Sequence, residues 1–233
     1  MSLSITPGTN NVGAYISNVD LTNLNNNQAT EIKKTLLVAN GLVKKNIIVD
    51  LEQDNFNCAP GGKYPCIKSA TNGKYLEMTV FGYLPSWSKP DFRRLHNARL
   101  EGIETKVSFK KLIVNSRAVV PLSGFIEWSS RENEKKVPYY FTRADSEDIF
   151  CPAIHDAGQF TIITREATEQ NAKIHHRQPV IISKSQINNY FNLNNNAVEF
   201  LKTVKPPELK YHEISTKINN PSANDATLIN PIN

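Results

Sequence analysis

The chain has 233 residues, which is long enough to bury a substantial core, and its composition is ordinary for a globular protein. Its net charge of +5 permits a polyanionic partner without requiring one. No apolar run is long enough to span a bilayer and no signal pattern opens the sequence, so we expect a cytoplasmic, intracellular protein. The three cysteines form neither an even disulfide framework nor a paired metal motif, which is typical of a reducing compartment.

The chain opens with a segment rich in Asn, Thr and Ser, and we expect residues 4–28 to be mostly loop. Apolar residues at helical spacing then predict a helix from Thr30 to Gly41. A short strand is expected at 47–51. Because the composition does not change after residue 30, we divide the chain into an Asn-rich N-terminal segment, 1–29, and one domain, 30–233.

A hairpin is predicted at Asn72-Gly73, joining a strand over 75–81 to the segment around Cys66. The next loop, 82–90, holds Trp87 among turn-forming residues. A tryptophan in such a loop is either a lid over the core or a platform on which a flat ligand such as a base can stack. Both interpretations stay open on these residues alone.

A dense polar cluster follows, in which Asn97 and Arg99 would share one face if the chain is extended there. An amide and a guanidinium could then contact one ligand together, although an ordinary solvated loop has the same composition. The pattern over 106–114 predicts a short helix with Val107 on its apolar side.

A strand is predicted over 117–128, and it carries one acidic residue among bulky apolar ones. Alternation places Phe125 and Glu127 on one face and Ile126 and Trp128 on the other. Desolvation by aromatic neighbours would raise the pKa of the Glu127 carboxyl towards neutrality, which suits a general acid or base. The alternative is a hydrogen-bonded, inert glutamate at the margin of a sheet.

In the second half of the chain, the sequence predicts strands first and helices later, with a charged hairpin tip at 129–136. An extended stretch over 174–182 puts His175 and Arg177 on one face, where the histidine is either structural or catalytic. Adjacent histidines are poor co-ligands, so we expect no metal site, and we expect no cofactor. The remaining predicted elements are strands at 137–141, 149–154, 159–164 and 211–215, a helical turn at 168–173, and helices at 184–191 and 197–204.

Eight short motifs in this order resemble the SOS response-associated peptidase (SRAP) family, and together they span residues 57–215. They are Asn57 to Pro60, Gly82 with Pro85-Ser86-Trp87, Asn97-Ala98-Arg99-x-Glu101, Gly124 to Trp128, Lys136-x-Pro138-Tyr139, Phe160 to Thr164, Ile174-His175-x-Arg177-x-Pro179-Val180, and Tyr211-His212 with Ser215.

The resemblance implies a single α+β domain in which bent sheets form a pseudo-barrel flanked by helices. It also implies an abasic-site lyase or autoprocessing peptidase of the DNA damage response, which forms a covalent link to abasic sites in single-stranded DNA. Carried over by motif, Asn97 orients the N-terminal residue and the sugar. Glu127 shuttles protons during amine attack, and His175 helps to open and release the sugar.

The same resemblance implies a basic groove for single-stranded DNA. By motif, Arg99 and Arg177 hold phosphates, Trp87 supports a base beside the lesion, and Thr164 contacts the DNA backbone. Guanidinium forks and aromatic faces are the groups that suit phosphates and exposed bases.

The family's N-terminal cysteine has no counterpart, because residue 2 is Ser and no cysteine precedes Cys58, for which we expect burial. Three hypotheses follow. A terminal amine alone could form a Schiff base with the abasic aldehyde. The chain could instead bind single-stranded DNA without covalent chemistry. It could also be a true peptidase built on Glu127 and His175, although no Ser or Cys lies in a supporting motif.

Overall fold

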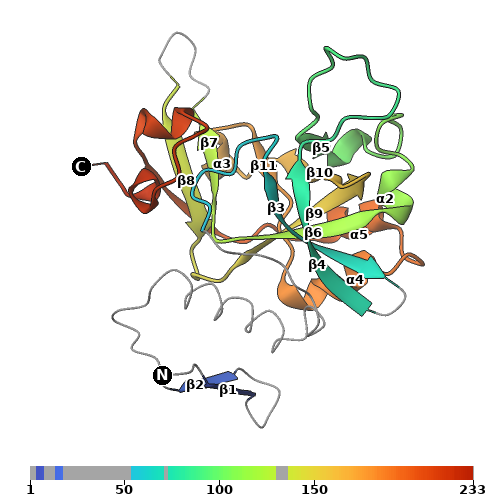
Figure 1. Ribbon diagram of the computed structural model, residues 1–233, viewed down its shortest axis with the longest axis horizontal. Coiled ribbons are helices and arrows are strands. Elements are labelled where there is room, and N and C mark those ends of the chain that lie inside the picture. Colours follow the sequence, from blue (N-terminus) through green and yellow to red (C-terminus); the bar gives the residue numbers. More distant parts are fainter. Residues whose placement is uncertain (1–3, 8–13, 18–53, 71–72, 130–135, 233) are drawn as a thin grey trace.

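The structure is a computed structural model that describes residues 4–7, 14–17, 54–70, 73–129 and 136–232. Strands dominate it and the helices are few and short (Figure 1). The larger sheet is built from seven strands: β3 Lys63–Ala70, β4 Gly73–Phe81, β5 Asn97–Arg99, β6 Arg117–Leu122, β9 Ile149–Asp156, β10 Gln159–Glu166 and β11 Arg177–Pro179.

Five of these strands pair in a ring that runs from β10 through β4, β3, β6 and β9 and returns to β10. Two contacts in the ring are short: β10 and β4 pair only at Gln159 with Val80 and Phe160 with Phe81, and β3 and β6 pair only at Ile67 with Val119 and Lys68 with Ala118. The ring is therefore twisted and incompletely closed rather than a regular barrel, and the expected α+β pseudo-barrel is confirmed. The hairpin predicted at Asn72-Gly73 is also confirmed, because β3 and β4 pair antiparallel from Ala70 and Gly73 outwards.

A second sheet contains β7 Phe125–Trp128, β8 Pro138–Arg143 and β12 Leu209–Glu213, in the order β12-β8-β7. The prediction of one strand over 117–128 is wrong, because the chain leaves the large sheet after β6 and enters this one at β7. The crossing requires a glycine. A Cβ on Gly124 would lie 2.4 Å from the ring of Tyr140 and 2.5 Å from the carbonyl oxygen of Phe141.

Side chains alternate along β7 as the sequence predicts. Phe125 stacks on Phe141, with ring centroids 5.0 Å apart, and belongs to the core between the sheets. Ile126 and Trp128 face the other way and pack against a small cluster from the C-terminal segment, which includes Ile214. Glu127 therefore points to the same side as Phe125 and lies at the edge of the main core.

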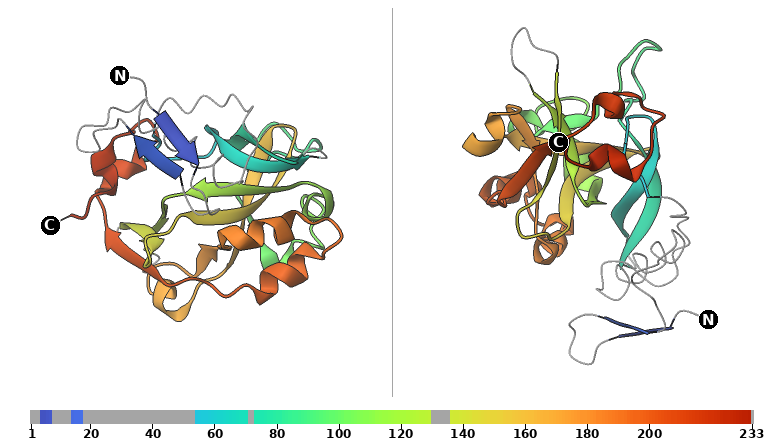
Figure 2. Two further views of the ribbon diagram at one scale, coloured as in Figure 1. Left: turned by 90° about the horizontal axis from the view of Figure 1, so that it is seen from below. Right: turned by 90° about the vertical axis from the view of Figure 1, so that its left-hand side faces the viewer.

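The helices α2, α4 and α5 lie away from the small sheet (Figure 1), and two of them cover β6 and β9 on one side (Figure 2). The short helix α3 lies beside the small sheet, where the Gln170 side chain donates to the carbonyl oxygen of Leu209 in β12. The helix expected from residue 106 begins only at Leu112, and Val107 is exposed. The buried guanidinium of Arg117 donates to the carbonyl oxygens of Ile113 and Tyr190, which joins the ends of α2 and α4. The bounds are α2 Leu112–Asn115, α3 Glu169–Ala172, α4 Ile187–Phe191 and α5 Ala197–Thr203, with 3-10 turns η1 Leu100–Gly102, η2 Lys184–Gln186, η3 Thr216–Asn219 and η4 Ala226–Ile229.

At the N-terminus, two short strands, β1 Ser4–Pro7 and β2 Ala14–Ser17, pair antiparallel, where the composition predicts mostly loop. The predicted helix from Thr30 and the strand at 47–51 lie outside the described residues. The boundary between 29 and 30 stays a prediction. Within the described part of the chain, no helix is both long and apolar enough to cross a membrane.

Candidate functional site

The two residues expected to exchange protons lie side by side. Glu127 comes from β7 and His175 from the turn before β11, and the Glu127 Oε2 and His175 Nδ1 atoms are 3.4 Å apart. Both side chains are about a quarter exposed, at 23% and 27%. They open into a cavity of about 540 Å³ whose other described lining residues are Trp128, Ser129, Lys136, His176 and Asn219.

The carboxyl group of Glu127 is poised to change its protonation state near neutral pH. Burial raises its pKa from 4.5 to about 7, although the neighbouring charge of His175 acts in the opposite direction. A carboxyl of this kind can take a proton from one group and return it to another without a large cost in either direction. The sequence-based expectation of a raised pKa is confirmed.

The imidazole of His175 is fixed through its Nδ1 atom. That atom lies 3.1 Å from the carbonyl oxygen of Arg177 and 3.3 Å from the backbone nitrogen of the same residue. A protonated Nδ1 can donate to the carbonyl or to Glu127, and an unprotonated one can accept from the backbone N–H. The ring orientation is therefore supported in either tautomer.

Asn97 and Arg99 lie on β5, which is extended as expected, with both residues exposed and Ala98 between them fully buried. The strand runs parallel to β10, where Arg99 pairs with Thr164. Asn97 is not among the described residues that line the cavity beside Glu127. The shared face of Asn97 and Arg99 is confirmed, and their functional roles stay predictions.

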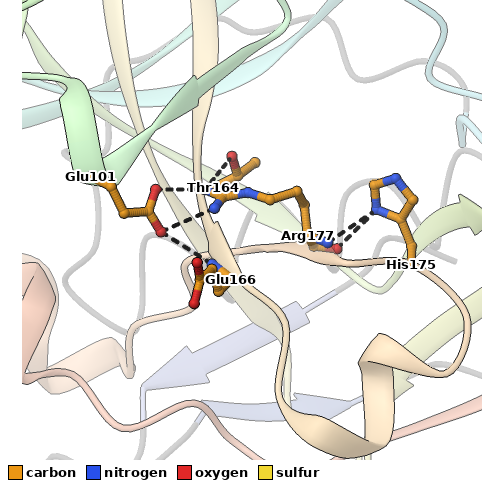
Figure 3. Close-up of polar contacts among 5 residues, drawn as sticks. All are labelled: Glu101, Thr164, Glu166, His175 and Arg177. Atoms are coloured by element: carbon orange, nitrogen blue, oxygen red, sulfur yellow. Dashed lines mark hydrogen bonds and ion pairs between the residues drawn. The ribbon is translucent and has the colours of Figure 1, made fainter.

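Arg177 is held by a second carboxylate. Its Nη1 and Nη2 atoms donate to the two oxygens of Glu101 at 3.0 and 2.8 Å, and Nη2 also lies 3.3 Å from the hydroxyl of Thr164 (Figure 3). Burial alone would raise the pKa of Glu101, but the hydrogen bonds and charge of Arg177 outweigh it and lower that pKa. Arg177 and Thr164 are thus adjacent, as a shared site requires, and their DNA contacts stay predictions.

Trp87 is 56% exposed and meets Phe92 edge to face, with ring centroids 5.6 Å apart. Its indole does not belong to the buried core clusters of the described residues, so the lid interpretation is wrong. An exposed, supported indole is compatible with a stacking platform. That role stays a prediction.

The expectation that Cys58 is buried is wrong, because this residue is exposed. Nearby protein atoms nevertheless desolvate its sulfur and raise the pKa of the thiol to about 11, so little reactive thiolate exists at neutral pH. No group of His, Cys, Asp or Glu within the described residues could hold a metal ion.

Several residues of the site were not assigned a role from the sequence. Glu101 and Lys136 lie within the motifs that carry the family resemblance, so their positions were available as a signal. In the sequence, His176 is only the second of two adjacent histidines and carries no further signal. Asn219 lies in a polar tail without a motif, yet its side chain accepts from the Trp128 indole at 2.8 Å and lines the cavity.

Comparison with known proteins gives a consistent result. The profile of the SOS response associated peptidase (SRAP) family matches residues 23–221. The chain is 29% identical over 205 residues to "Abasic site processing protein YedK" of Escherichia coli (strain K12), covering 82% of this chain and 90% of that protein. It is 25% identical over 196 residues to "Abasic site processing protein YoaM" of Bacillus subtilis (strain 168), covering 78% and 86%. A crystal structure of a protein from Bacteroides thetaiotaomicron superposes with a TM-score of 0.63 at 25% identity, covering 74% of this chain and 82% of that one.

Proposed function

Because the chain belongs to the SOS response-associated peptidase family, we propose that it processes abasic sites in single-stranded DNA, using Glu127 and His175 to move protons. The observation that carries this proposal is the 3.4 Å approach of the two side chains at one cavity. The names of the relatives, all abasic site processing proteins, support the substrate class.

The proposed reaction joins an amine of the protein to the aldehyde of the ring-opened abasic sugar. The nitrogen lone pair attacks the aldehyde carbon, and the ionised carboxylate of Glu127 accepts a proton from that nitrogen. The aldehyde oxygen takes a proton from solvent and becomes a hydroxyl. The protonated carboxyl then donates its proton to that hydroxyl, so water leaves and a protonated imine (Schiff base) remains. A carboxyl with a pKa of about 7 is suited to both halves of this exchange.

His175 has a complementary role in this proposal. Its ring, held by the backbone of Arg177, lies beside Glu127, where it can exchange a proton with the ring oxygen of the sugar as the sugar opens or is released. Asn97, exposed on β5, is assigned to orienting the sugar and the attacking amine through its amide.

The DNA contacts are proposed on the neighbouring surface. Arg99 is exposed at the end of β5 and can hold a phosphate, and Trp87 offers an exposed indole to a base. Thr164 is largely buried and already receives a hydrogen bond from Arg177, so we assign its contact with the DNA backbone as secondary. Exposed bases are available for stacking in single strands and not in a duplex, which supports single-stranded DNA as the partner.

Borohydride trapping tests this proposal. Incubating the protein with an oligonucleotide that contains one abasic site, and then reducing with borohydride, should give a covalent adduct on a denaturing gel. Because general acid–base catalysis contributes about a hundredfold or more, Glu127→Gln should slow adduct formation at least that much. Undamaged oligonucleotide should give no adduct.

Two further variants control the experiment. Glu199→Gln makes the same chemical change at an exposed glutamate of α5 and should leave the rate unchanged. Lys136→Arg removes the one lysine amine among the described residues that line the cavity, and peptide mapping of the adduct by tandem mass spectrometry then identifies the amine that reacts. A wild-type protein that forms no adduct with abasic DNA would contradict the proposal.

The second candidate function is non-covalent binding of single-stranded DNA, which the exposure of Trp87 and Arg99 favours. In that case affinity falls steeply with salt, because phosphate contacts release counterions, and Glu127→Gln leaves the affinity unchanged. The absence of a trapped adduct together with salt-dependent binding would select this function over the first.

A further inference from the structure

The side chain and the backbone of Arg177 contact different partners, and this arrangement suggests a role that differs from phosphate binding. Its guanidinium is bound by Glu101 through two hydrogen bonds of 3.0 and 2.8 Å. Its backbone carbonyl and N–H both lie within 3.3 Å of the His175 ring (Figure 3). One residue therefore connects a surface carboxylate to the imidazole of the proposed active site.

The guanidinium has little capacity left for an external ligand. The Arg177 side chain is only 12% exposed, and its Nε atom is buried without a hydrogen-bond partner among the described residues. Of the five N–H groups of an arginine, three point to Glu101 and Thr164. A phosphate would have to displace Glu101, because the planar fork that suits two phosphate oxygens is already filled by two carboxylate oxygens.

Glu101 is itself held in place, so it can act as a fixed support. Its Oε1 atom accepts from the backbone N–H of Glu166 at 3.2 Å, and its neighbour Leu100 is buried. Glu166 pairs with Arg177 across β10 and β11. The carboxylate thus ties the turn that follows β5 to the ends of β10 and β11, and β11 begins two residues after His175.

We propose that Glu101 is a positioning residue, which binds the Arg177 guanidinium so that the Arg177 backbone holds the His175 ring beside Glu127. The proposal rests on the proposed function of this site. It assigns Arg177 to the support of His175 and leaves Arg99, exposed on the neighbouring strand β5, as the arginine that contacts phosphate. An error of about 1 Å in the position of a catalytic group can cost about a hundredfold in rate, so such a support is valuable.

The first experiment uses the free protein and needs no DNA. The NMR signals of the His175 ring are followed through a pH titration. The other ionisable side chains that line the cavity, Glu127, Lys136 and His176, are kept unchanged in every variant. Glu101→Ala should shift the His175 titration and broaden its ring signals, because the Arg177 backbone is no longer fixed. Glu101→Gln, which keeps the shape and one hydrogen bond, should have a smaller effect, and Arg99→Ala should have none.

The second experiment uses abasic single-stranded DNA. Glu101→Ala should lower the rate of borohydride-trapped adduct formation by about tenfold to a hundredfold at saturating DNA, without changing the salt dependence of binding. Arg99→Ala should reduce the slope of log affinity against log salt by about 0.7, the value for one phosphate contact to a single strand. Arg177→Lys should behave like Glu101→Ala, because an ammonium cannot form the two parallel bonds.

The outcomes separate this inference from the proposed function. If the wild type forms no adduct, the proposed function fails, whereas the His175 titration still tests the positioning role. If Arg177→Ala reduces the salt slope by about 0.7 and leaves the His175 titration unchanged, Arg177 is a phosphate contact and the inference is overturned. If Glu101→Ala fails to fold, Glu101→Gln tests the proposal instead. An unchanged His175 titration in Glu101→Gln contradicts the proposal.

Discussion

Two carboxylates lie on either side of the segment from His175 to Arg177, and their environments move their pKa values in opposite directions. Glu127 faces a partly enclosed cavity and the imidazole of His175 at 3.4 Å, and burial raises its pKa to about 7. Glu101 is more exposed and is bound by a guanidinium fork at 2.8 and 3.0 Å, which lowers its pKa despite partial burial.

The difference shows how one residue type serves two purposes on two sides of one short segment. A carboxylate that is desolvated without a full set of hydrogen bonds exchanges protons near neutral pH. A carboxylate that receives two charge-assisted hydrogen bonds stays ionised and acts as a rigid support. The chemistry follows from the partners that each side chain finds in the fold, so the comparison can be tested by removing either charge or either partner.

The largest expected effect is on stability at alkaline pH. The pKa of Glu127 rises from 4.5 in the unfolded chain to about 7 in the folded protein, so the folded state binds the proton more tightly. The free energy of unfolding therefore falls as the pH rises between these values, by up to about 3 kcal/mol. Glu127→Gln should remove this loss and stabilise the protein by up to that amount at pH 8, as measured by urea unfolding.

The control for this prediction is its pH dependence. At pH 4 the wild-type carboxyl is protonated in both states, so Glu127→Gln should change the stability little there. Glu199→Gln, at an exposed site, should show no such dependence on pH. Equal stabilisation by Glu127→Gln at pH 4 and at pH 8 would mean that the charge of Glu127 is not the cause.

Much of the fold was accessible from the sequence because local patterns agree with the tertiary structure. Alternation on β7 correctly places Phe125 and Glu127 on one face, and the predicted hairpin correctly pairs β3 with β4. The division of the predicted strand at Gly124 was missed, because the need for glycine comes from the close approach of Tyr140 and Phe141 on another strand. Such contacts are not visible in local periodicity.

The site was predictable to a similar extent. The raised pKa of Glu127 follows from its apolar neighbours, and its meeting with His175 was expected from the family resemblance rather than from spacing. Glu101 and Arg177 form an ion pair although they lie 76 positions apart in the chain. Neither the residue types nor the spacing indicates which partner a charged side chain binds in the folded protein. Asn219 reached the cavity through the packing of the C-terminal segment on Trp128, which depends on tertiary structure alone.

A smaller effect is expected when the partner of Glu127 is removed. The charge of His175 lowers the pKa of Glu127 and partly offsets the effect of burial. His175→Gln should therefore raise that pKa further above 7. Carbon-13 NMR of the Glu127 carboxyl measures this change. His176→Gln, at the exposed adjacent ring, is the matched control, and an equal shift in both variants would show a general change of the cavity instead.

The smallest expected effect has the opposite sign to the first. The lowered pKa of Glu101 means that its ion pair stabilises the folded protein above the unfolded pKa of 4.5, and that this stabilisation is lost as the pH falls through the folded pKa. Because the Glu101 side chain is 48% exposed, solvent screening reduces the contribution to about 1 kcal/mol or less. Glu101→Gln should therefore destabilise the protein at pH 7 by that amount, as measured by urea unfolding, and much less at pH 2. The same exchange of Glu for Gln thus stabilises at position 127 and destabilises at position 101, and an equal sign at both positions would contradict the assignment of one carboxylate to proton exchange and the other to support.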